Sequence, residues 1–349
     1  DDDRYEVDLY AGEKKGELWN QLPERVSTYR LYPNPLIGKI TSHLYRKFQM
    51  DWFFRYYGKK ISGRYDVGIN FNDNIYTEFL FYNQAEIKKR VAVIHCSYKT
   101  FTNRSKFVKG NYKKIMINRF KKLDTIISVS KEALEEFTEL FGECYDMRVI
   151  YNPINNQDII TKSKQKLPEE LANKSFNFIA IGSLFPVKGY DLLIEACSLI
   201  KNRGVHFKLN ILGKGHLREH LIKKIKKFQL EKNVYLRGFI SNPYPWLRNS
   251  DALIMSSKAE GLPTVLCEAM ILGVPTLVPN VPGCREIVDY GKYGMMFNRN
   301  AGDMAEAMIK IINNKNVYKH YKKMSEQRSH LFNDQKALNE YYKIFNESI

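Results

Sequence analysis

Residues 256–270 read SSKAEGLPTVLCEAM and join an apolar strand, Ala252–Ser256, to a helix that begins near Thr264. Gly261 allows a tight turn between the two elements, because glycine carries no Cβ. Pro263 stands at or just before the first helical position, where its missing N–H is tolerated. The free amides of the first helical turn and the helix dipole then predict an anion site suited to a diphosphate.

Two carboxylates flank this turn. Glu260 stands at its edge, and Glu268 lies further along the helix. Carboxylates do not favour a phosphate, so we expect them to accept hydrogen bonds from sugar hydroxyls, one on a transferred hexose and one on a ribose. From the residues alone, a surface Glu and a helix-solubilising Glu are an equally good interpretation.

Strands and helices alternate through the second half of the chain. This order predicts a parallel sheet with right-handed crossovers, in which ligands lie at the carboxyl ends of the strands. The apolar runs predict strands at Phe176–Ile181, Phe207–Leu212, Val234–Leu236, Ala252–Ser256 and Pro275–Val278, and helices at Tyr190–Asn202, His216–Phe228, from Ser241–Pro245, and at Thr264–Leu272.

The first half of the chain is less regular. A doubly wound domain usually opens with a buried strand and a glycine-rich turn, and neither is visible after the opening Asp1, Asp2 and Asp3. We therefore expect a first strand–helix unit to have been removed. The remaining pattern predicts short strands at Tyr5–Leu9, Val67–Ile69, Val91–Ile94, Thr125–Val129 and Val149–Ile150, and a helix Lys131–Leu140 capped by Ser130.

Three further segments accompany the Glu260–Glu268 spacing. They are GSLFPVKGYDLLIEA (182–196), LGKGHLRE (212–219) and GVPTLVPNVPGCREIVDYGKYGMMF (273–297). In this order, over about residues 149–312, the segments resemble retaining GT-B glycosyltransferases of family 4, the group 1 transferases. The resemblance implies an α/β GT-B fold, in which the parallel sheets of two Rossmann-like domains face each other across a cleft.

The resemblance also implies a division of labour along the chain. Residues 1–150 would form an N-terminal acceptor-binding domain, and residues 151–330 a C-terminal domain that binds the nucleotide sugar. Residues 331–349 would form a helix that packs back toward the N-terminal domain. The implied reaction moves a hexose with retention from a nucleotide sugar, expected to be a UDP-sugar, to a glycan or lipid-linked glycan. Such reactions build bacterial surface polysaccharides, including capsule and lipopolysaccharide.

The same resemblance assigns roles to individual residues. Glu260 would contact hydroxyls of the hexose, Glu268 the ribose, and Lys188 the diphosphate as a point charge. Two positions depart from the family pattern: Ser183 replaces a common phosphate-binding Arg, and Lys214 stands where an acidic residue is common. The expected donor-binding residues are Gly182, Ser183, Lys188, Gly213, Lys214, Glu260, Gly261, Leu262, Pro263, Thr264, Val265 and Glu268.

His95 ends the apolar run Val91–Ile94, and the family often carries a His at a comparable strand end. It could hydrogen-bond the sugar or the attacking oxygen, or it could be structural. With Glu260 and Lys188 it completes the expected catalytic set. No D-x-D metal motif is evident, so we expect no metal and no other cofactor, and a phosphate oxygen of the leaving group would accept the proton of the acceptor.

Charge is concentrated in the first half of a chain whose net charge is +17. Residues 39–122 hold 19 Lys and Arg against five Asp and Glu, and aromatic residues are interleaved with the bases over Ile40–Tyr57 and Lys99–Lys122. This pattern predicts contact with an anionic membrane and a polyprenyl-diphosphate-linked acceptor. The alternative is that these aromatic residues form the core of the N-terminal domain.

Cysteine use favours a cytoplasmic protein, and the basic segments rich in aromatic residues predict that it is peripheral on the inner face of the cytoplasmic membrane. The five cysteines are odd in number and widely spaced, as expected of reduced thiols: Cys96, Cys144, Cys197, Cys267 and Cys284. Other functions stay open. A sugar-nucleotide epimerase or a non-catalytic subunit could share the fold, and the basic charge alone would suit a nucleic-acid-binding protein. We expect no nucleic acid as partner, because no nucleic-acid-binding motif is present.

Overall fold

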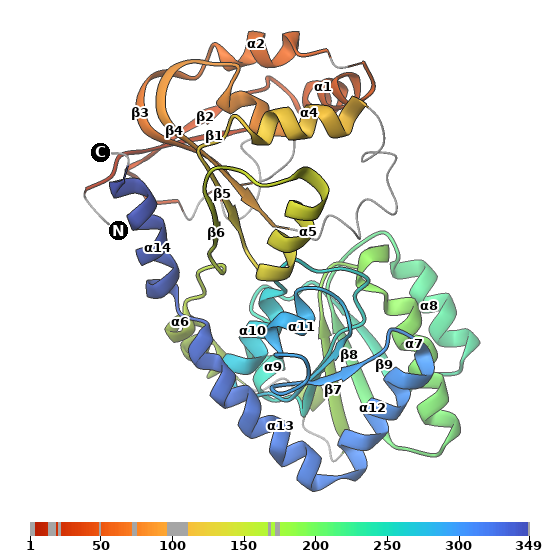
Figure 1. The fold of residues 1–349 in the computed structure, drawn as a ribbon. Coiled ribbons are helices and arrows are strands. Elements are labelled where there is room, and N and C mark those ends of the chain that lie inside the picture. Colours follow the sequence, from red (N-terminus) through yellow and green to blue (C-terminus); the bar gives the residue numbers. More distant parts are fainter. Residues whose placement is uncertain are drawn as a thin grey trace.

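The computed structural model describes residues 4–12, 19, 22–48, 50–71, 75–95, 111–166, 169–171 and 175–347. Three parallel sheets organise these residues (Figure 1). Cys96 and the basic stretch from Lys99 to Gly110 lie outside the described residues, as do Asp1 to Asp3.

The sheet of the C-terminal half has six parallel strands in the order β12-β11-β10-β7-β8-β9. It grows from β7 in both directions, so the strand order reverses between β7 and β10, and ligands of open α/β sheets bind at such a point. Its strands are β7 (Phe176–Ile181), β8 (Phe207–Leu212), β9 (Val234–Gly238), β10 (Ala252–Ile254), β11 (Thr276–Pro279) and β12 (Met295–Phe297).

Helices bury both faces of this sheet, because successive side chains of a strand point to opposite sides. Phe178 and Ala180 pack with α7 (Tyr190–Asn202), α8 (Arg218–Lys227) and α12 (Ala301–Asn313). The intervening Ile179 packs with the other side's helices. These are α6 (Asn156–Ser163), α9 (Tyr244–Arg248), α10 (Thr264–Ile271) and α11 (Cys284–Ile287).

The N-terminal half has a four-stranded parallel sheet in the order β3-β4-β5-β6. A separate parallel pair lies beside it, and the hydroxyl of Tyr65 on β3 bonds to Asp8 (2.6 Å) and Tyr10 (3.0 Å) of that pair. The strands are β3 (Ser62–Asn70), β4 (Gln84–Ile94), β5 (Thr125–Ser128) and β6 (Met147–Val149), and the pair is β1 (Val7–Ala11) with β2 (Val26–Arg30).

The two faces of the four-stranded sheet are covered by distant parts of the chain. Ala92, Ile94 and Ile126 pack with α4 (Asn111–Phe120) and α5 (Lys131–Phe141). The alternate residues of the same strands share a core with α14 (Asp334–Asn346) near the C-terminus. That core includes Val91, Val93, Ile127, Ala337, Tyr341 and Ile344. Figure 1 shows α13 (Lys315–Arg328) and α14 running along one side of the molecule, from the C-terminal half up to the N-terminal half.

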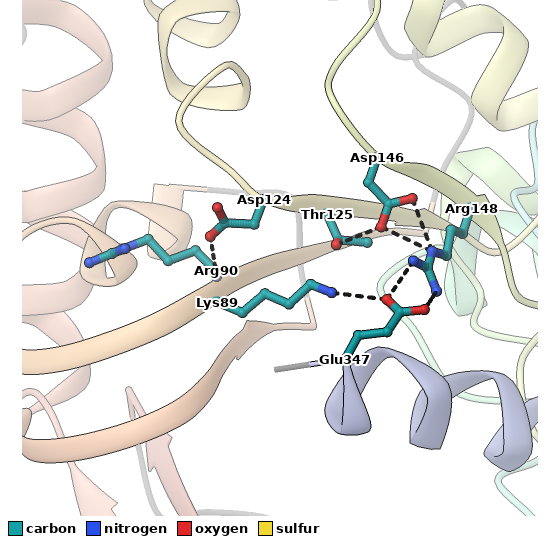
Figure 2. Close-up of polar contacts among 7 residues, drawn as sticks. All are labelled: Lys89, Arg90, Asp124, Thr125, Asp146, Arg148 and Glu347. Atoms are coloured by element: carbon teal, nitrogen blue, oxygen red, sulfur yellow. Dashed lines mark hydrogen bonds and ion pairs between the residues drawn. The ribbon is translucent and has the colours of Figure 1, made fainter. Parts of the chain in front are cut away.

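Polar contacts fix the end of α14 to this sheet (Figure 2). The carboxylate of Glu347 accepts from Arg148 on β6 (2.7 Å) and from Lys89 on β4 (3.2 Å). Arg148 also pairs with Asp146 (2.9 Å). The hydrogen bond from Arg148 lowers the pKa of Glu347. Tyr5 stacks on Tyr342 with 5.6 Å between ring centroids, so the two ends of the described chain meet here.

The expected elements of the C-terminal half agree closely with the structure. β7, β8 and α7 have the predicted bounds, and the other strands and helices shift by a few residues. In the N-terminal half, Ser130 caps α5 as expected by accepting from the amide of Ala133. The strand predicted at Tyr5–Leu9 is β1, which pairs with β2 and not with the four-stranded sheet.

The shorter elements complete the chain. Two helices cover the outer end of the N-terminal half, α1 (Pro35–Phe48) and α2 (Trp52–Gly58). Cys144, Cys197, Cys267 and Cys284 are free thiols. No helix among the described residues is both long and apolar enough to cross a bilayer. The short 3-10 helices are η2 (Ile75–Leu80), η4 (Glu169–Leu171), η5 (Pro186–Lys188) and η6 (Ser329–Leu331).

Candidate functional site

The candidate site lies at the carboxyl ends of β7 and β10, where the strand order of the C-terminal sheet reverses. The turn after β7 carries Lys188, and the turn after β10 carries Glu260. Two hydrogen bonds hold these turns together: Ser256 Oγ donates to the Lys188 carbonyl (2.7 Å), and the Lys258 amide donates to the Val187 carbonyl (2.7 Å). These contacts therefore fix the positions of the backbone segments that carry the side chains of Lys188 and Glu260.

Gly189 is required at this junction. Its φ is +68°, and a Cβ at this position would stand 2.2 Å from the carbonyl oxygen of Ser256. Both the left-handed conformation and the close approach exclude larger residues. The turn after β7 can pack against the turn after β10 only with glycine here.

The side chains of Lys188 and Glu260 meet between these turns. Lys188 Nζ lies 2.7 Å from Glu260 Oε1, and the two side chains are only 22% and 13% exposed. A hydrogen bond between two charged and shielded groups is stronger than a surface ion pair. The Tyr190 hydroxyl donates to the Gly182 carbonyl (3.2 Å), and burial followed by the charge of Glu260 raises the pKa of Tyr190.

The turn Glu260–Pro263 leads directly into α10. Leu262 is buried and Thr264 is exposed, so the chain emerges at the first helical residue. Pro263 is the N-cap residue with extended backbone, and no side chain caps the helix. No side chain of the described residues accepts from the first amides of α10, and a helix start of this kind attracts anions.

Glu268 lies on the same helix and is deeply placed. Burial raises the pKa of its carboxyl to about 7. The hydroxyl of Tyr244 has its own pKa raised to about 12 by burial first and by the charge of Glu268 second, so these two side chains lie near each other. A carboxyl with this pKa changes between acceptor and donor near neutral pH.

Backbone bonds link the glycine turns after β7, β8 and β9. The Gly182 amide donates to the Leu212 carbonyl (2.9 Å), and the Gly213 amide donates to the Gly238 carbonyl (2.7 Å). Ser183, which follows Gly182, is half-buried. Lys214 is exposed, and its ammonium lies 4.7 Å from the centre of the Phe239 ring. A cation in that position is stabilised by the aromatic face.

His95 follows β4 directly and is half-buried at the carboxyl end of the N-terminal sheet. It belongs to the other half of the chain from Lys188 and Glu260. The register of β4 and β5 places the preceding Ile94 beside Ser128, and α5 starts three residues after Ser128. His95 therefore lies on the same edge as the helix that contacts the C-terminal half.

A third segment lies at this site, within residues 273–297 of the resemblance, although the sequence analysis assigned no role to its residues. Gly283 has a φ of +76°, and a Cβ there would stand 2.3 Å from the Gly261 carbonyl oxygen. The loop that contains Gly283 therefore packs directly against the backbone of the turn Glu260–Pro263. Glu286 and Arg285 follow on α11 and reach the N-terminal half at Lys131 and Glu132. Only the folded chain brings these residues to the site.

The described residues contain no group of three or more His, Cys, Asp or Glu side chains that could hold a metal ion. The charged groups described above include Lys188, Glu260 and Glu268, together with the start of α10. This set can bind a diphosphate next to a polyhydroxyl group.

The chain is similar to known glycosyltransferases. The family model of glycosyl transferases group 1 matches residues 161–329. A Campylobacter jejuni enzyme is 27% identical over 283 residues, which cover 75% of this chain and 73% of that protein. It is N-acetylgalactosamine-N,N'-diacetylbacillosaminyl-diphospho-undecaprenol 4-alpha-N-acetylgalactosaminyltransferase.

A second relative is the poly(ribitol-phosphate) alpha-N-acetylglucosaminyltransferase of Staphylococcus aureus, with 25% identity over 229 residues. That match covers 65% of this chain, and the chain spans less than half, 44%, of that relative.

The fold has a solved counterpart of nearly the same length. The structure of Anabaena HepE in complex with UDP and glucose superposes with a TM-score of 0.73. The superposition covers 98% of this chain and 99% of HepE at 16% identity. Residues 161–329 therefore match glycosyl transferases group 1, and the chain has the two-domain GT-B fold.

Proposed function

We propose that the protein transfers a hexose, with retention, from a nucleotide sugar to a glycan or lipid-linked glycan in bacterial surface polysaccharide synthesis. The observation that carries this proposal is the shielded pair Lys188–Glu260, 2.7 Å apart beside the uncapped start of α10. A cation and free amides suit a diphosphate, and the adjacent carboxylate suits a sugar hydroxyl.

Each of these groups has a role when the donor binds. Lys188 moves its charge from Glu260 to the diphosphate, whose negative charge grows as the glycosidic bond breaks. Glu260 then accepts hydrogen bonds from the hexose, and Glu268 accepts them from the ribose. Amides from Gly261 to Val265 hold the sugar and the phosphates. The site's own cation and helix start would neutralise the leaving group without a metal ion.

The transfer itself needs positioning more than a protein nucleophile. An oxygen of the leaving phosphate accepts the proton of the acceptor hydroxyl, and His95 orients that hydroxyl from the N-terminal half. Retention of an α-linked donor gives an α-linked product. The names of the two relatives above, both alpha-glycosyltransferases, support this stereochemistry.

The donor is a UDP-sugar in this proposal. The HepE structure with UDP and glucose supports it, because its fold matches the chain over almost its whole length. The acceptor is a polyprenyl-diphosphate-linked glycan. The Campylobacter relative acts on a diphospho-undecaprenol substrate by its name, and the net charge of +17 on this chain suits a diphosphate and anionic lipid.

The surface formed by α1 and α2 would contact the membrane on the cytoplasmic side. Leu36 and Ile40 are exposed on one face of α1, on the same face as the exposed Lys39, His43 and Lys47. The opposite face of α1 is buried. An apolar stripe flanked by bases is the pattern of helices that lie in the interface of an anionic bilayer.

The second helix continues this surface. Trp52 and Tyr56 of α2 are about half exposed or more, whereas Phe54 between them is fully buried. The aromatic residues of this segment thus divide into a core set and a surface set. Core formation explains Phe54 and Tyr45, but it leaves the exposed rings of Trp52 and Tyr56 for a membrane.

A thermal-shift screen against UDP-, GDP- and ADP-sugars tests the donor proposal. One UDP-sugar should raise the melting temperature more than UDP alone. Incubation of that sugar nucleotide with a lipid-linked glycan should then give an α-linked product. Release of an isomerised sugar nucleotide without any acceptor would indicate an epimerase.

Sedimentation with vesicles tests the membrane proposal separately. The protein should bind vesicles that contain anionic lipid and leave neutral vesicles in the supernatant. Serine at Leu36, Ile40, Trp52 and Tyr56 should abolish binding. Serine at Tyr145, an aromatic residue that is 99% exposed outside this surface, serves as the control and should leave binding unchanged. Equal binding to both kinds of vesicle would contradict the proposal.

A further inference from the structure

Two buried carboxylates, one from each half of the molecule, accept hydrogen bonds from the other half. The first belongs to Glu286 on α11 and lies at the start of α5. Its Oε1 accepts from the Lys131 amide (2.9 Å), and its Oε2 accepts from the Glu132 amide (3.0 Å). The hydroxyl of Tyr151 also donates to Oε1 (2.6 Å). A carboxylate in this position satisfies two helix-terminal amides and favours the positive end of the helix dipole.

The second carboxylate belongs to the N-terminal half and accepts hydrogen bonds from the C-terminal half. Glu132, in the first turn of α5, accepts from the Gly283 amide at the start of α11 (3.1 Å). Arg285 Nε donates to the same carboxylate (3.1 Å), as does the Tyr290 hydroxyl (3.3 Å). The charge of Glu132 is the main cause of the raised pKa of Tyr290. Each helix start is therefore met by a carboxylate of the facing half.

Neither carboxylate could be buried without these partners. Glu132 is 8% exposed and Glu286 is 9% exposed. A charge removed from water is strongly destabilising unless donors surround it, and each of these carboxylates has three. All the donors except Tyr151, which follows β6 at the junction of the halves, come from the facing half. Separation of the two halves would remove them together.

Gly283 connects these hydrogen bonds between the halves to the site proposed to bind the donor. The amide of Gly283 is held by Glu132, and its Cα side packs against the carbonyl of Gly261 in the turn Glu260–Pro263, the donor-binding turn of the proposed function. On the far side, Arg328 donates to the carbonyls of Glu286 (2.9 Å) and Ile287 (2.8 Å). The loop before α11 is thus held between α5 and the turn Glu260–Pro263, and α11 itself is held by α13.

We propose that Glu132 and Glu286 form a reciprocal latch between the two domains, and that they are positioning residues for the donor-binding turn. The latch holds α5 against the loop before α11, and this loop holds Glu260 and Gly261 in place. The latch itself follows from the contacts above, whereas its effect on donor binding rests on the proposed function.

Amide hydrogen exchange without any sugar nucleotide tests the latch. Glu286→Gln keeps the size of the side chain, but a carboxamide has a single acceptor oxygen. At least one of the Lys131 and Glu132 amides should then exchange about tenfold faster or more. The Ala133 amide should keep its rate, because it bonds to Ser130 Oγ in its own domain (3.3 Å). Glu132→Gln should accelerate the Gly283 amide in the same way.

Two results would overturn the latch. Unchanged exchange rates at all three amides would show that the two carboxylates do not accept hydrogen bonds from these amides in solution. Equal acceleration at Ala133 would show that the variant unfolds the start of α5. The control is Glu135→Gln, which removes an exposed carboxylate from the same helix and should change none of these rates.

Calorimetric titration with UDP then separates the latch from the proposed function. Both latch variants should bind UDP several-fold more weakly than wild type, and Glu135→Gln should bind it as wild type does. If wild type does not bind UDP while the exchange result holds, the proposed function fails and the latch stands. If UDP binds wild type and both latch variants equally, the positioning role is wrong.

Discussion

Lys188 and Glu260 form a shielded ion pair 2.7 Å long, although 72 residues separate them in the sequence. Each comes from a turn at the carboxyl end of a strand, on either side of the point where the strand order reverses. Opposite charges held this close and largely away from water must find other partners if a ligand separates them. A nucleotide sugar offers both partners, a diphosphate for Lys188 and hydroxyls for Glu260.

Lys188→Met should weaken UDP binding by about tenfold to a hundredfold, because a hydrogen bond to a charged group contributes roughly 1.5–3 kcal/mol. Calorimetric titration with UDP measures this loss. Lys226→Met removes an exposed lysine of α8 and should leave the affinity unchanged. Wild-type affinity in Lys188→Met would show that this lysine does not contact the diphosphate.

Binding of a UDP-sugar should depend on pH through Glu268. Burial raises the pKa of this carboxyl to about 7, and only its ionised form accepts hydrogen bonds from both ribose hydroxyls. Affinity for a UDP-sugar, whose diphosphate diester has no proton to lose in this range, should therefore increase from pH 6 to pH 8, and this increase should disappear in Glu268→Gln. A pH dependence that survives the substitution would assign it to another group.

Glu268 should also lower the stability of the protein at high pH. The pKa of its carboxyl in the folded state lies above the value of 4.5 for an unperturbed Glu, so the native state binds the proton more tightly than the unfolded state does. Its contribution is present below pH 4.5 and is lost as the pH rises through about 7. Glu268→Gln should increase the free energy of unfolding at pH 8 by on the order of 3 kcal/mol. Equal stability of the two proteins in denaturant titrations at pH 8 would contradict this.

Gly283→Ala should disturb the donor-binding turn. The new Cβ would meet the Gly261 carbonyl at 2.3 Å, in a backbone conformation that alanine disfavours. Gly204→Ala is a matched control, because Gly204 has a similar φ of +72° and no atom within 4 Å of the new Cβ. Both variants should lose about 1 kcal/mol from the backbone strain. Only Gly283→Ala should lose UDP affinity as well.

The C-terminal helix should stabilise the N-terminal sheet through its apolar face. Ile344 is fully buried in the core that includes Val91, Val93 and Ile127. Ile344→Ala should lower the free energy of unfolding by about 2–5 kcal/mol. Glu347→Ala breaks a more exposed ion pair with Arg148 and should lower it by less than about 1 kcal/mol. Similar losses from the two variants would show that the ion pair, and not the apolar face, anchors the helix.

The C-terminal sheet could be predicted from the sequence because its strands are buried on both faces. Phe176–Ile181 and Phe207–Leu212 are mostly apolar runs followed by glycine, and each forms a strand with those bounds. The first half gives a weaker signal. β3 is nine residues long but carries Arg64, Asp66 and Asn70, so only its centre at Val67–Ile69 was predictable. β2 was not predicted at all.

The site was predictable only where it is local in the sequence. The turn Glu260–Pro263 and the helix after it are contiguous, so their geometry follows from glycine, proline and the strand before them. The hydrogen bonds between the α5 start at Glu132 and the carboxylate of Glu286 join residues 154 positions apart. No periodicity or spacing indicates such a pair, because it depends on how the two domains meet.

Calorimetric titration of wild type and Glu260→Gln, with UDP and with a panel of UDP-sugars, tests the central claim most directly. The account predicts that wild type binds one UDP-sugar more tightly than UDP. Glu260→Gln should lose this preference and keep its affinity for UDP, because the diphosphate is held by Lys188 and the start of α10. Equal loss of affinity for UDP and for every UDP-sugar would contradict the separate roles of the carboxylate and the phosphate site.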